Sequence, residues 1–317
     1  MGTIVRVPPT EIDLTDRDGS LQLSCQDTEL FRYVYRPDDP QVESPRPYFH
    51  PVRTLRGDPV TGYRPADHVW HKGIAWSLPH VGPENFWGGP TFQRGYGYRQ
   101  LPNNGRIRHE EFSTAAVTDG ALRVDEQLTW ITQDGETWLQ ERRQIGARVL
   151  PGTEAWLLAF RTTLHNVRGA IITFGSPTTA GRDNAGYGGL CWRGPASFSP
   201  GRVITSSGTG GDEYMGWRGR WLAFAGQHDE DRASTLVFRD APSNVGHPTM
   251  WFVRTDPFAC VCPAPFFAAE FMLADGQSLH LRYDVAVADG ELPAARCAEL
   301  VAEMEASDLL GVPGAVA

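Results

Sequence analysis

Apolar and polar residues alternate along several stretches of this chain. Between residues 122 and 130 the even positions are apolar, and only Glu126 interrupts the series. The same period of two recurs in residues 156–164 and 279–287. A period of two is typical of β-strands that bury one face. Shorter strand candidates are residues 29–36, 169–174, 202–206, 220–225, 234–239, 249–254 and 266–273.

A helix pattern is convincing only near the end of the sequence. Strong helix formers follow Pro293 and continue to Leu310, where Gly311 ends the run. Asp-Gly pairs and other turn signals separate the strand candidates. The sequence therefore predicts an all-β fold, a large antiparallel β-sandwich with one C-terminal helix. We expect one domain over residues 1–317, with edge strands in 1–40 and the helix, residues 293–310, packed outside.

Composition and charge exclude several classes of function. The 38 acidic and 29 basic residues give a formal net charge of -9, which predicts no binding to nucleic acid or to an anionic membrane surface. The chain has no apolar run of about 18 residues, the length that spans a membrane. It also begins without the apolar stretch of a signal peptide, so we expect a cytoplasmic protein. Its 10 Trp, 15 Phe and 9 Tyr predict a large folded core.

The five cysteines show no spacing of a disulfide framework or a zinc site. Cys260 and Cys262 are separated by one residue, whereas a zinc knuckle needs two, so we expect free thiols. Dinucleotide-binding and phosphate-binding loops are absent, as are serine-nucleophile motifs. We therefore expect no cofactor and a small-molecule partner, and the sequence leaves a homodimer open.

Residues 44–112 combine polar and aromatic residues more densely than any other region. Five of the nine histidines lie here: His50, His68, His71, His80 and His109. Frequent Pro and Gly predict loops, and a long loop rich in His and Trp is a candidate binding site. The alternative is a surface lid that its aromatic residues attach to the sandwich.

His68 and His71 form the tightest unit of this region, in Asp67-His68-Val69-Trp70-His71-Lys72-Gly73. On a strand, residues three apart face opposite ways, but in a loop or turn both imidazoles could reach one point. They could then transfer protons, or bind a metal with His109 as a third ligand. The alternative is a structural role, in which Asp67 and one imidazole only form hydrogen bonds that stabilise the loop.

Further candidates lie on expected strands and turns. Alternation places His109 and Glu111 on one face, where they could assist as acid and base. Arg254 could stabilise an oxyanion. The expected substrate-binding residues are Trp70, Trp76, Trp87, His50, Asn244, His247 and Trp251.

Four motifs resemble those of one bacterial protein family. They are RPYFHPVRT, DHVWHKGIAW with NFWGG, APSNVGHPTMWFVR and LHLRYDVAVADG, in this order between about residues 30 and 290. The family is a domain of unknown function that is often labelled methane oxygenase PmoA-like, a label that does not suit a chain without a membrane span. Typical members read His-Pro-His-His-Arg-Gly, of which this chain keeps His68, His71 and Gly73 and has Trp70 and Lys72 at two other positions. The resemblance implies a mutarotase-type β-sandwich and carbohydrate substrates.

Three hypotheses of function follow. The first is a carbohydrate-active enzyme that uses His68 and His71 as acid and base for epimerisation, elimination or hydrolysis, which makes it an isomerase, lyase or hydrolase. The second is a non-catalytic carbohydrate-binding protein that uses the same aromatic residues. The third is a metal-dependent, cupin-style enzyme built on His68, His71 and His109. The concentration of imidazoles favours the first.

Overall fold

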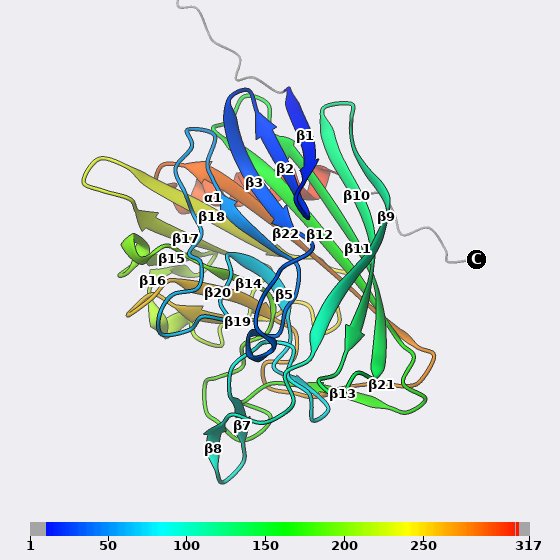
Figure 1. Cartoon of the computed structure of the whole chain (residues 1–317). Coiled ribbons are helices and arrows are strands. Elements are labelled where there is room, and N and C mark those ends of the chain that lie inside the picture. The colour runs from blue at the N-terminus through cyan, green and yellow to red at the C-terminus, as the bar shows by residue number, and fades with distance from the viewer. Residues whose placement is uncertain (1–10, 308, 311–317) are drawn as a thin grey trace, which may run out of the picture.

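Two large antiparallel sheets face each other in the computed structural model, which describes residues 11–307 and 309–310 (Figure 1). The order of the eight-stranded sheet is β1 (Ile12–Arg17), β2 (Ser20–Cys25), β3 (Thr28–Val34), β4 (Tyr48–Val52), β5 (Ile74–Ser77), β14 (Gly189–Arg193), β20 (Cys260–Ala264) and β19 (Met250–Arg254). The order of the nine-stranded sheet is β16 (Gly208–Gly210), β15 (Arg202–Thr205), β17 (Trp221–Gln227), β18 (Ala233–Asp240), β22 (Ser278–Asp289), β12 (Ala155–Asn166), β11 (Thr137–Val149), β10 (Ala121–Ile131) and β9 (Arg106–Thr118). The predicted all-β fold with antiparallel sheets is confirmed.

Smaller elements extend one end of the sandwich. A three-stranded sheet has the order β21 (Phe271–Leu273), β13 (Ile172–Gly175) and β6 (His80–Val81). The hairpin of β7 (Thr91–Gln93) and β8 (Gly97–Arg99) projects beyond it (Figure 1). Three short 3-10 helices span Gln41–Glu43, Ala196–Phe198 and Asp212–Tyr214.

The segments with the clearest alternation of apolar and polar residues form central strands of the nine-stranded sheet. They are β10, β12 and β22, and β11 completes the block. Trp130, Trp156 and Leu158 point between the two sheets into one large apolar core shared with the other sheet. This shared core supports the proposal that the chain forms one domain. The predicted N-terminal edge strands correspond to β1–β3, of which β1 ends its sheet, while residues 1–10 lie outside the described residues.

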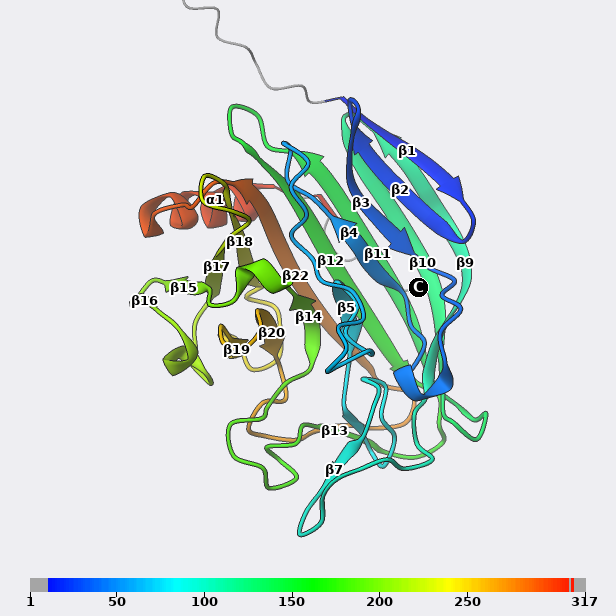
Figure 2. The ribbon, with the colours of Figure 1, turned by 60° about the vertical axis from the view of Figure 1, so that its left-hand side comes forward.

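The single described α-helix, α1 (Ala294–Ala306), covers the outer face of the nine-stranded sheet (Figure 2). Its Leu300 and Met304 pack with Leu157 of β12 and Ala286 of β22 in a second apolar cluster. The predicted helix is therefore confirmed, although it ends before residue 310. Among the described residues, no helix has the length and apolarity needed to cross a lipid bilayer.

Candidate functional site

A cavity of about 440 Å³ opens on the outer face of the eight-stranded sheet, at its β14–β20–β19 end. The period of two along these strands explains its floor. Trp192, Trp251 and Val261 point into the sandwich core, while Phe252 and Cys260 point outward to the cavity. Loops supply the walls, and the aromatic lining is Trp70, Trp87, Tyr98, Tyr187, Phe252 and Phe258.

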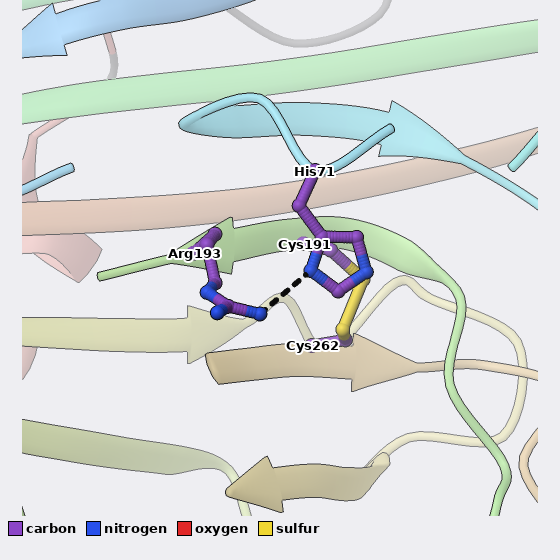
Figure 3. Close-up of a disulfide and its surroundings, with 4 residues drawn as sticks. All are labelled: His71, Cys191, Arg193 and Cys262. Atoms are coloured by element: carbon purple, nitrogen blue, oxygen red, sulfur yellow. Dashed lines mark hydrogen bonds between the residues drawn. A yellow bond between two sulfur atoms is a disulfide. The ribbon is translucent and has the colours of Figure 1, made fainter. Parts of the chain in front are cut away.

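A disulfide between Cys191 and Cys262 joins two adjacent strands of this floor (Figure 3). The register pairs Trp192 with Val261, which sets the two cysteines opposite each other on β14 and β20, with 4.2 Å between their Cα atoms. The expectation of free thiols was therefore wrong for this pair. The two residues lie 71 positions apart in sequence, and only the strand pairing brings them together.

His68 and His71 come together in a tight turn of the loop between β4 and β5. The backbone N–H of His71 donates to the carbonyl of His68 at 2.9 Å, so both side chains leave the turn on one side. Their rings stack with centroids 4.8 Å apart and an interplanar angle of 26°. Both line the cavity, and His71 lies beside the disulfide (Figure 3).

Hydrogen-bond partners assign the tautomer of each imidazole. The carboxylate of Asp67 accepts from His68 Nδ1 at 2.6 Å, so a neutral His68 keeps its lone pair on Nε2. The guanidinium of Arg193 can only donate, and it reaches His71 Nδ1 at 3.1 Å, so a neutral His71 carries its hydrogen on Nε2 (Figure 3). The two stacked rings therefore present opposite functions, a proton acceptor on His68 and a hydrogen-bond donor on His71.

Burial keeps His71 neutral. Desolvation lowers its pKa well below the ordinary value, and the positive charges of His68, Arg193 and Arg46 lower it further. Burial raises the pKa of Asp67, but the hydrogen bond with His68 and the charge of Arg193 outweigh this and lower it. Asp67 is thus held as an anion beside His68.

Buried ion pairs hold the His68–His71 turn in place. Lys72 is completely buried and pairs with Asp39 and, at 2.9 Å, with Glu43. Arg64 donates twice to Glu43, at 2.6 and 3.1 Å. Burial opposes ionisation of Glu43, yet the hydrogen bonds from Arg64 and Lys72 lower its pKa overall. The turn is therefore anchored on both sides, which fixes the two imidazoles without using their own polar atoms.

Arg46 and Gly73 complete this anchoring. The guanidinium of Arg46 is buried and donates to the carbonyl of Trp70 at 2.7 Å. Gly73 has φ +54°, and a Cβ there would lie 2.0 Å from the carbonyl oxygen of Phe49. The chain can pass this close to β4 because glycine has no side chain.

Three more of the predicted site residues line the cavity with the imidazole pair. Trp70 and Trp87 line it, and Trp87 meets the His71 ring edge-on at 5.3 Å. Arg254 also lines the cavity, on the outward face of β19. Asp67, expected only as a loop partner, contacts both His68 and Arg193.

The structure does not bring His109 or Glu111 to the cavity. His109 lies between the sheets, where its Nδ1 is 2.7 Å from Glu126 and its ring contacts Tyr35 and Phe112. Glu111 is exposed on the surface. The register explains the correction, because residues 109 and 111 of β9 oppose the consecutive residues Leu128 and Gln127 of β10. This bulge breaks the alternation that was expected to place both side chains on one face.

Trp76 and Trp251 were also wrongly placed in the binding site. Both are fully buried in the sandwich core, at 1% and 0% exposure, because they occupy the inward positions of β5 and β19. Trp251 and Arg254 cannot share a cavity, since positions three apart on a strand face opposite ways.

The remaining candidates bind to neighbours away from the cavity. His50 stacks on Tyr63 with an interplanar angle of 11°, and burial lowers its pKa to about 4. Asn244 and His247 both bond the buried carboxylate of Asp240, at 2.7 and 2.8 Å. They hold a turn together, as the turn chemistry of their sequence already allowed.

The proposed three-imidazole metal site is not formed, because His109 lies in the core. Among residues 11–307 and 309–310, no group of three or more His, Cys, Asp or Glu side chains is arranged to hold a metal ion. The sequence reasoning in turn missed Arg193 and Phe258, which lie far from residues 44–112 in the sequence.

These features define an all-β protein with an aromatic cavity and a stacked imidazole pair on the outer face of one sheet. The chain belongs to a family of unknown function, DUF6807, whose model matches residues 20–302. The suspected domain of unknown function is therefore confirmed, and the match gives no support to a methane-oxygenase label. No curated protein matches the sequence.

Several solved carbohydrate-active enzymes are distantly similar in structure. The GH36 α-galactosidase AgaA from Geobacillus stearothermophilus is 11% identical with a TM-score of 0.39, over 89% of this chain and 41% of the enzyme. The galactosidase domain of AgaSK is 10% identical with a TM-score of 0.42, over 88% and 42%. This chain thus spans about two fifths of these galactosidase chains.

A galactose mutarotase-related enzyme from Lactobacillus acidophilus is 8% identical with a TM-score of 0.29, over 89% of this chain and 98% of the enzyme. All of these TM-scores lie below 0.5, so the likenesses are distant.

Proposed function

We propose that the cavity is the active site of an enzyme that performs imidazole acid–base chemistry on a sugar or sugar-like metabolite. The observation that carries this proposal is the stacked pair with opposite tautomers, Asp67–His68 and Arg193–His71. A binding site needs no such pairing, whereas proton transfer needs a base with a free lone pair beside a donor that stabilises the product anion.

His68 is the proposed general base. Its Nε2 takes a proton from a substrate carbon next to a carbonyl or carboxyl group, and Asp67 stabilises the imidazolium that forms. The electron pair of the broken C–H bond moves onto the substrate oxygen. His71 Nε2–H donates a hydrogen bond to this oxyanion without transferring its proton, since Arg193 blocks Nδ1 and burial keeps the ring neutral.

The fate of the proton on His68 then determines the class of reaction. In epimerisation a water molecule delivers a proton to the opposite face of the carbon, and His68 releases the proton that it removed to solvent. Transfer of that proton from His68 to a leaving oxygen on the adjacent carbon, as the C=C bond forms, gives elimination. In hydrolysis His68 would instead take the proton of an attacking water. Isomerase, lyase and hydrolase thus share one base.

The walls of the cavity support a sugar-like substrate. Trp70, Trp87 and Phe258 offer flat apolar surfaces for the C–H face of a ring, and Asn184 and Arg254 offer hydrogen bonds to hydroxyl groups. The cavity, at about 440 Å³, is large enough for a small-molecule ligand.

The test uses a panel of aldoses, ketoses, sugar acids and glycosides in D₂O, followed by proton NMR. Loss of a C–H signal or release of an aglycone, abolished in His68→Asn, would support the proposal. Exchange or release that is equally fast in His68→Asn would contradict it. Binding without any reaction across the panel would favour the second candidate, a non-catalytic carbohydrate-binding protein that uses the same aromatic walls.

A further inference from the structure

The polar side chains of the cavity supply more hydrogen-bond donors than acceptors. They include His68, His71, Arg182, Asn184 and Arg254, and no Asp or Glu is part of the lining, which lies wholly within the described residues. Guanidinium groups donate and never accept, and the indole N–H of tryptophan also only donates. A neutral sugar presents hydroxyl protons that need acceptors, so this lining suits a ligand richer in acceptors.

Arg182 is the charge in the lining that no carboxylate balances. It lies on the loop between β13 and β14, and its guanidinium stands 4.8 Å over the ring of Tyr98 and donates to the Tyr98 hydroxyl. Among the described residues it forms no ion pair with a carboxylate, and Asp183 beside it is not part of the lining. Arg182 is exposed, so a ligand that enters the cavity from solvent can reach its charge.

The phenol of Tyr187 does not supply a negative charge near Arg182. The hydroxyl of Tyr98 lies 3.0 Å from that of Tyr187. Burial raises the pKa of Tyr187 well above its ordinary value, and the nearby Tyr98 raises it further. Tyr187 therefore stays protonated at neutral pH, and the positive charge of Arg182 faces the cavity uncompensated.

Arg254, the second arginine of the lining, is oriented by an acidic neighbour. Its Nη1 donates to Asp212 at 3.2 Å. The other oxygen of Asp212 accepts from the backbone N–H of Thr255 at 2.6 Å and from its hydroxyl at 2.9 Å. The carboxylate thus shares its charge with Thr255, and one edge of the Arg254 guanidinium keeps its donors for a ligand.

We infer that the substrate of this site is an anionic sugar, which carries a carboxylate or phosphate group that Arg182 and Arg254 bind. This inference rests on the proposed function and names its substrate class. The chain has a formal net charge of -9, so the surface outside the cavity repels anions on the whole. A cationic cavity would therefore bind an anionic ligand selectively.

A carboxylate next to the reacting carbon would also assist the chemistry. When His68 removes the proton from that carbon, the electron pair of the C–H bond moves onto the carboxylate oxygens. An arginine that binds this group stabilises the added negative charge in the transition state. The cationic lining would thus serve binding and turnover together.

The test measures affinities by calorimetry for glucose, galactose, glucuronate, galacturonate and glucose 6-phosphate, with wild type, Arg182→Gln and a matched control. The control is Arg36→Gln, which removes one exposed charge just after β3, away from the cavity lining. We expect the acids to bind at least roughly 10-fold more tightly than the neutral sugars. Arg182→Gln should weaken them roughly 10- to 100-fold, and Arg36→Gln less than about 2-fold.

Each outcome separates the two proposals. The uronates and the sugar phosphate distinguish carboxylate from phosphate as the bound group. Neutral sugars that bind as tightly as the acids, absence of acid binding, or equal losses in the two variants would overturn the inference. If C–H protons exchange in D₂O only on neutral sugars, the anionic-substrate inference is wrong and the proposed acid–base function stands. Tight binding of acids without any reaction would keep the anionic ligand and remove the catalysis.

Discussion

Two histidine–carboxylate pairs of almost equal geometry lie in very different parts of this molecule. His68 Nδ1 is 2.6 Å from Asp67, and His109 Nδ1 is 2.7 Å from Glu126. The side chains of the first pair are 36% and 51% exposed, and those of the second are 3% and 0% exposed. A histidine beside a carboxylate is therefore not by itself a site, because only the first pair has a free ring edge that a substrate can reach.

The pairs also differ in what surrounds them. Around Glu126, Tyr33 donates a hydrogen bond at 2.5 Å, and Arg143 in turn donates to Tyr33 at 2.9 Å. Every polar group of this core network is held by another, which suits a structural role. The His68 ring has a hydrogen bond only to Asp67, which Arg193 also contacts at 3.5 Å, and the rings of Trp70 and Phe258 lie beside it.

The largest expected effect is on turnover at the exposed pair. Once a substrate is known, His68→Asn should lower kcat roughly 10²–10⁴-fold, because it removes the general base. The melting temperature should hardly change, since the side chain is partly exposed and adds little packing. Steady-state kinetics and thermal unfolding measure the two effects. A variant with full kcat would show that His68 is not the base.

The next effect should appear at the buried pair as a loss of stability. Glu126→Ala leaves His109 and Tyr33 without their shared partner in the core, which should cost about 3–5 kcal/mol in the free energy of unfolding. Urea titration measures this cost. The folded fraction should keep the specific activity of wild type. A stable Glu126→Ala protein without activity would place this pair in the catalytic machinery instead.

A somewhat smaller effect is expected for the disulfide under the cavity. Replacing Cys191 and Cys262 together by alanine should lower the free energy of unfolding by about 2–4 kcal/mol, because the bond closes a long loop of the unfolded chain. The same loss should follow reduction of the wild type, and urea titration with and without dithiothreitol measures it. Equal stability in the two conditions would show that the bond does not form in the protein.

The smallest effect concerns pH. The folded protein lowers the pKa of His71, so below the ordinary histidine range the unfolded chain binds a proton that the folded chain does not. His71 thus contributes to a stability that is present above pH 6.5 and is lost as the pH falls. Unfolding free energies at pH 7 and pH 5 should differ less in His71→Gln than in wild type, by about 1 kcal/mol. His280→Gln, at an exposed position, is the control and should behave as wild type. An unchanged pH dependence in His71→Gln would contradict the assigned cause.

Period-two alternation was sufficient to predict the fold class. It located β10, β12 and β22 because each presents a continuous apolar face to one core. The interruption at Glu126 looked like a defect in the pattern, yet this buried carboxylate is the centre of the core network. One sequence cannot show this, because the partners Tyr33 and His109 lie on other strands.

The site was predictable only where its residues are close in sequence. His68, Trp70 and His71 share one turn, so their clustering survives folding. Arg193 reaches this turn from β14, a strand 122 residues after His71, and no local signal marks that pairing. Stricter use of the period of two would have separated Trp251 from Arg254. The bulge that separates His109 from Glu111 has no signature in the sequence.

The Cys191–Cys262 disulfide also bears on location. Disulfides persist mainly in oxidising compartments, which counts against the expected cytoplasm. The cellular location therefore stays a prediction. Alkylation of free thiols during purification would show whether the disulfide is present in the protein as it leaves the cell.

The central claim is that substrate binds at the open imidazole pair and not in any other part of the fold. A crystal structure with the most reactive sugar or sugar acid, bound to His68→Asn to prevent turnover, tests it most directly. We expect the ring against Trp70 or Trp87, and its reacting carbon within about 3.5 Å of the position of His68 Nε2 in wild type. A ligand bound elsewhere, or one in the cavity whose carbons all lie far from that position, would contradict the account.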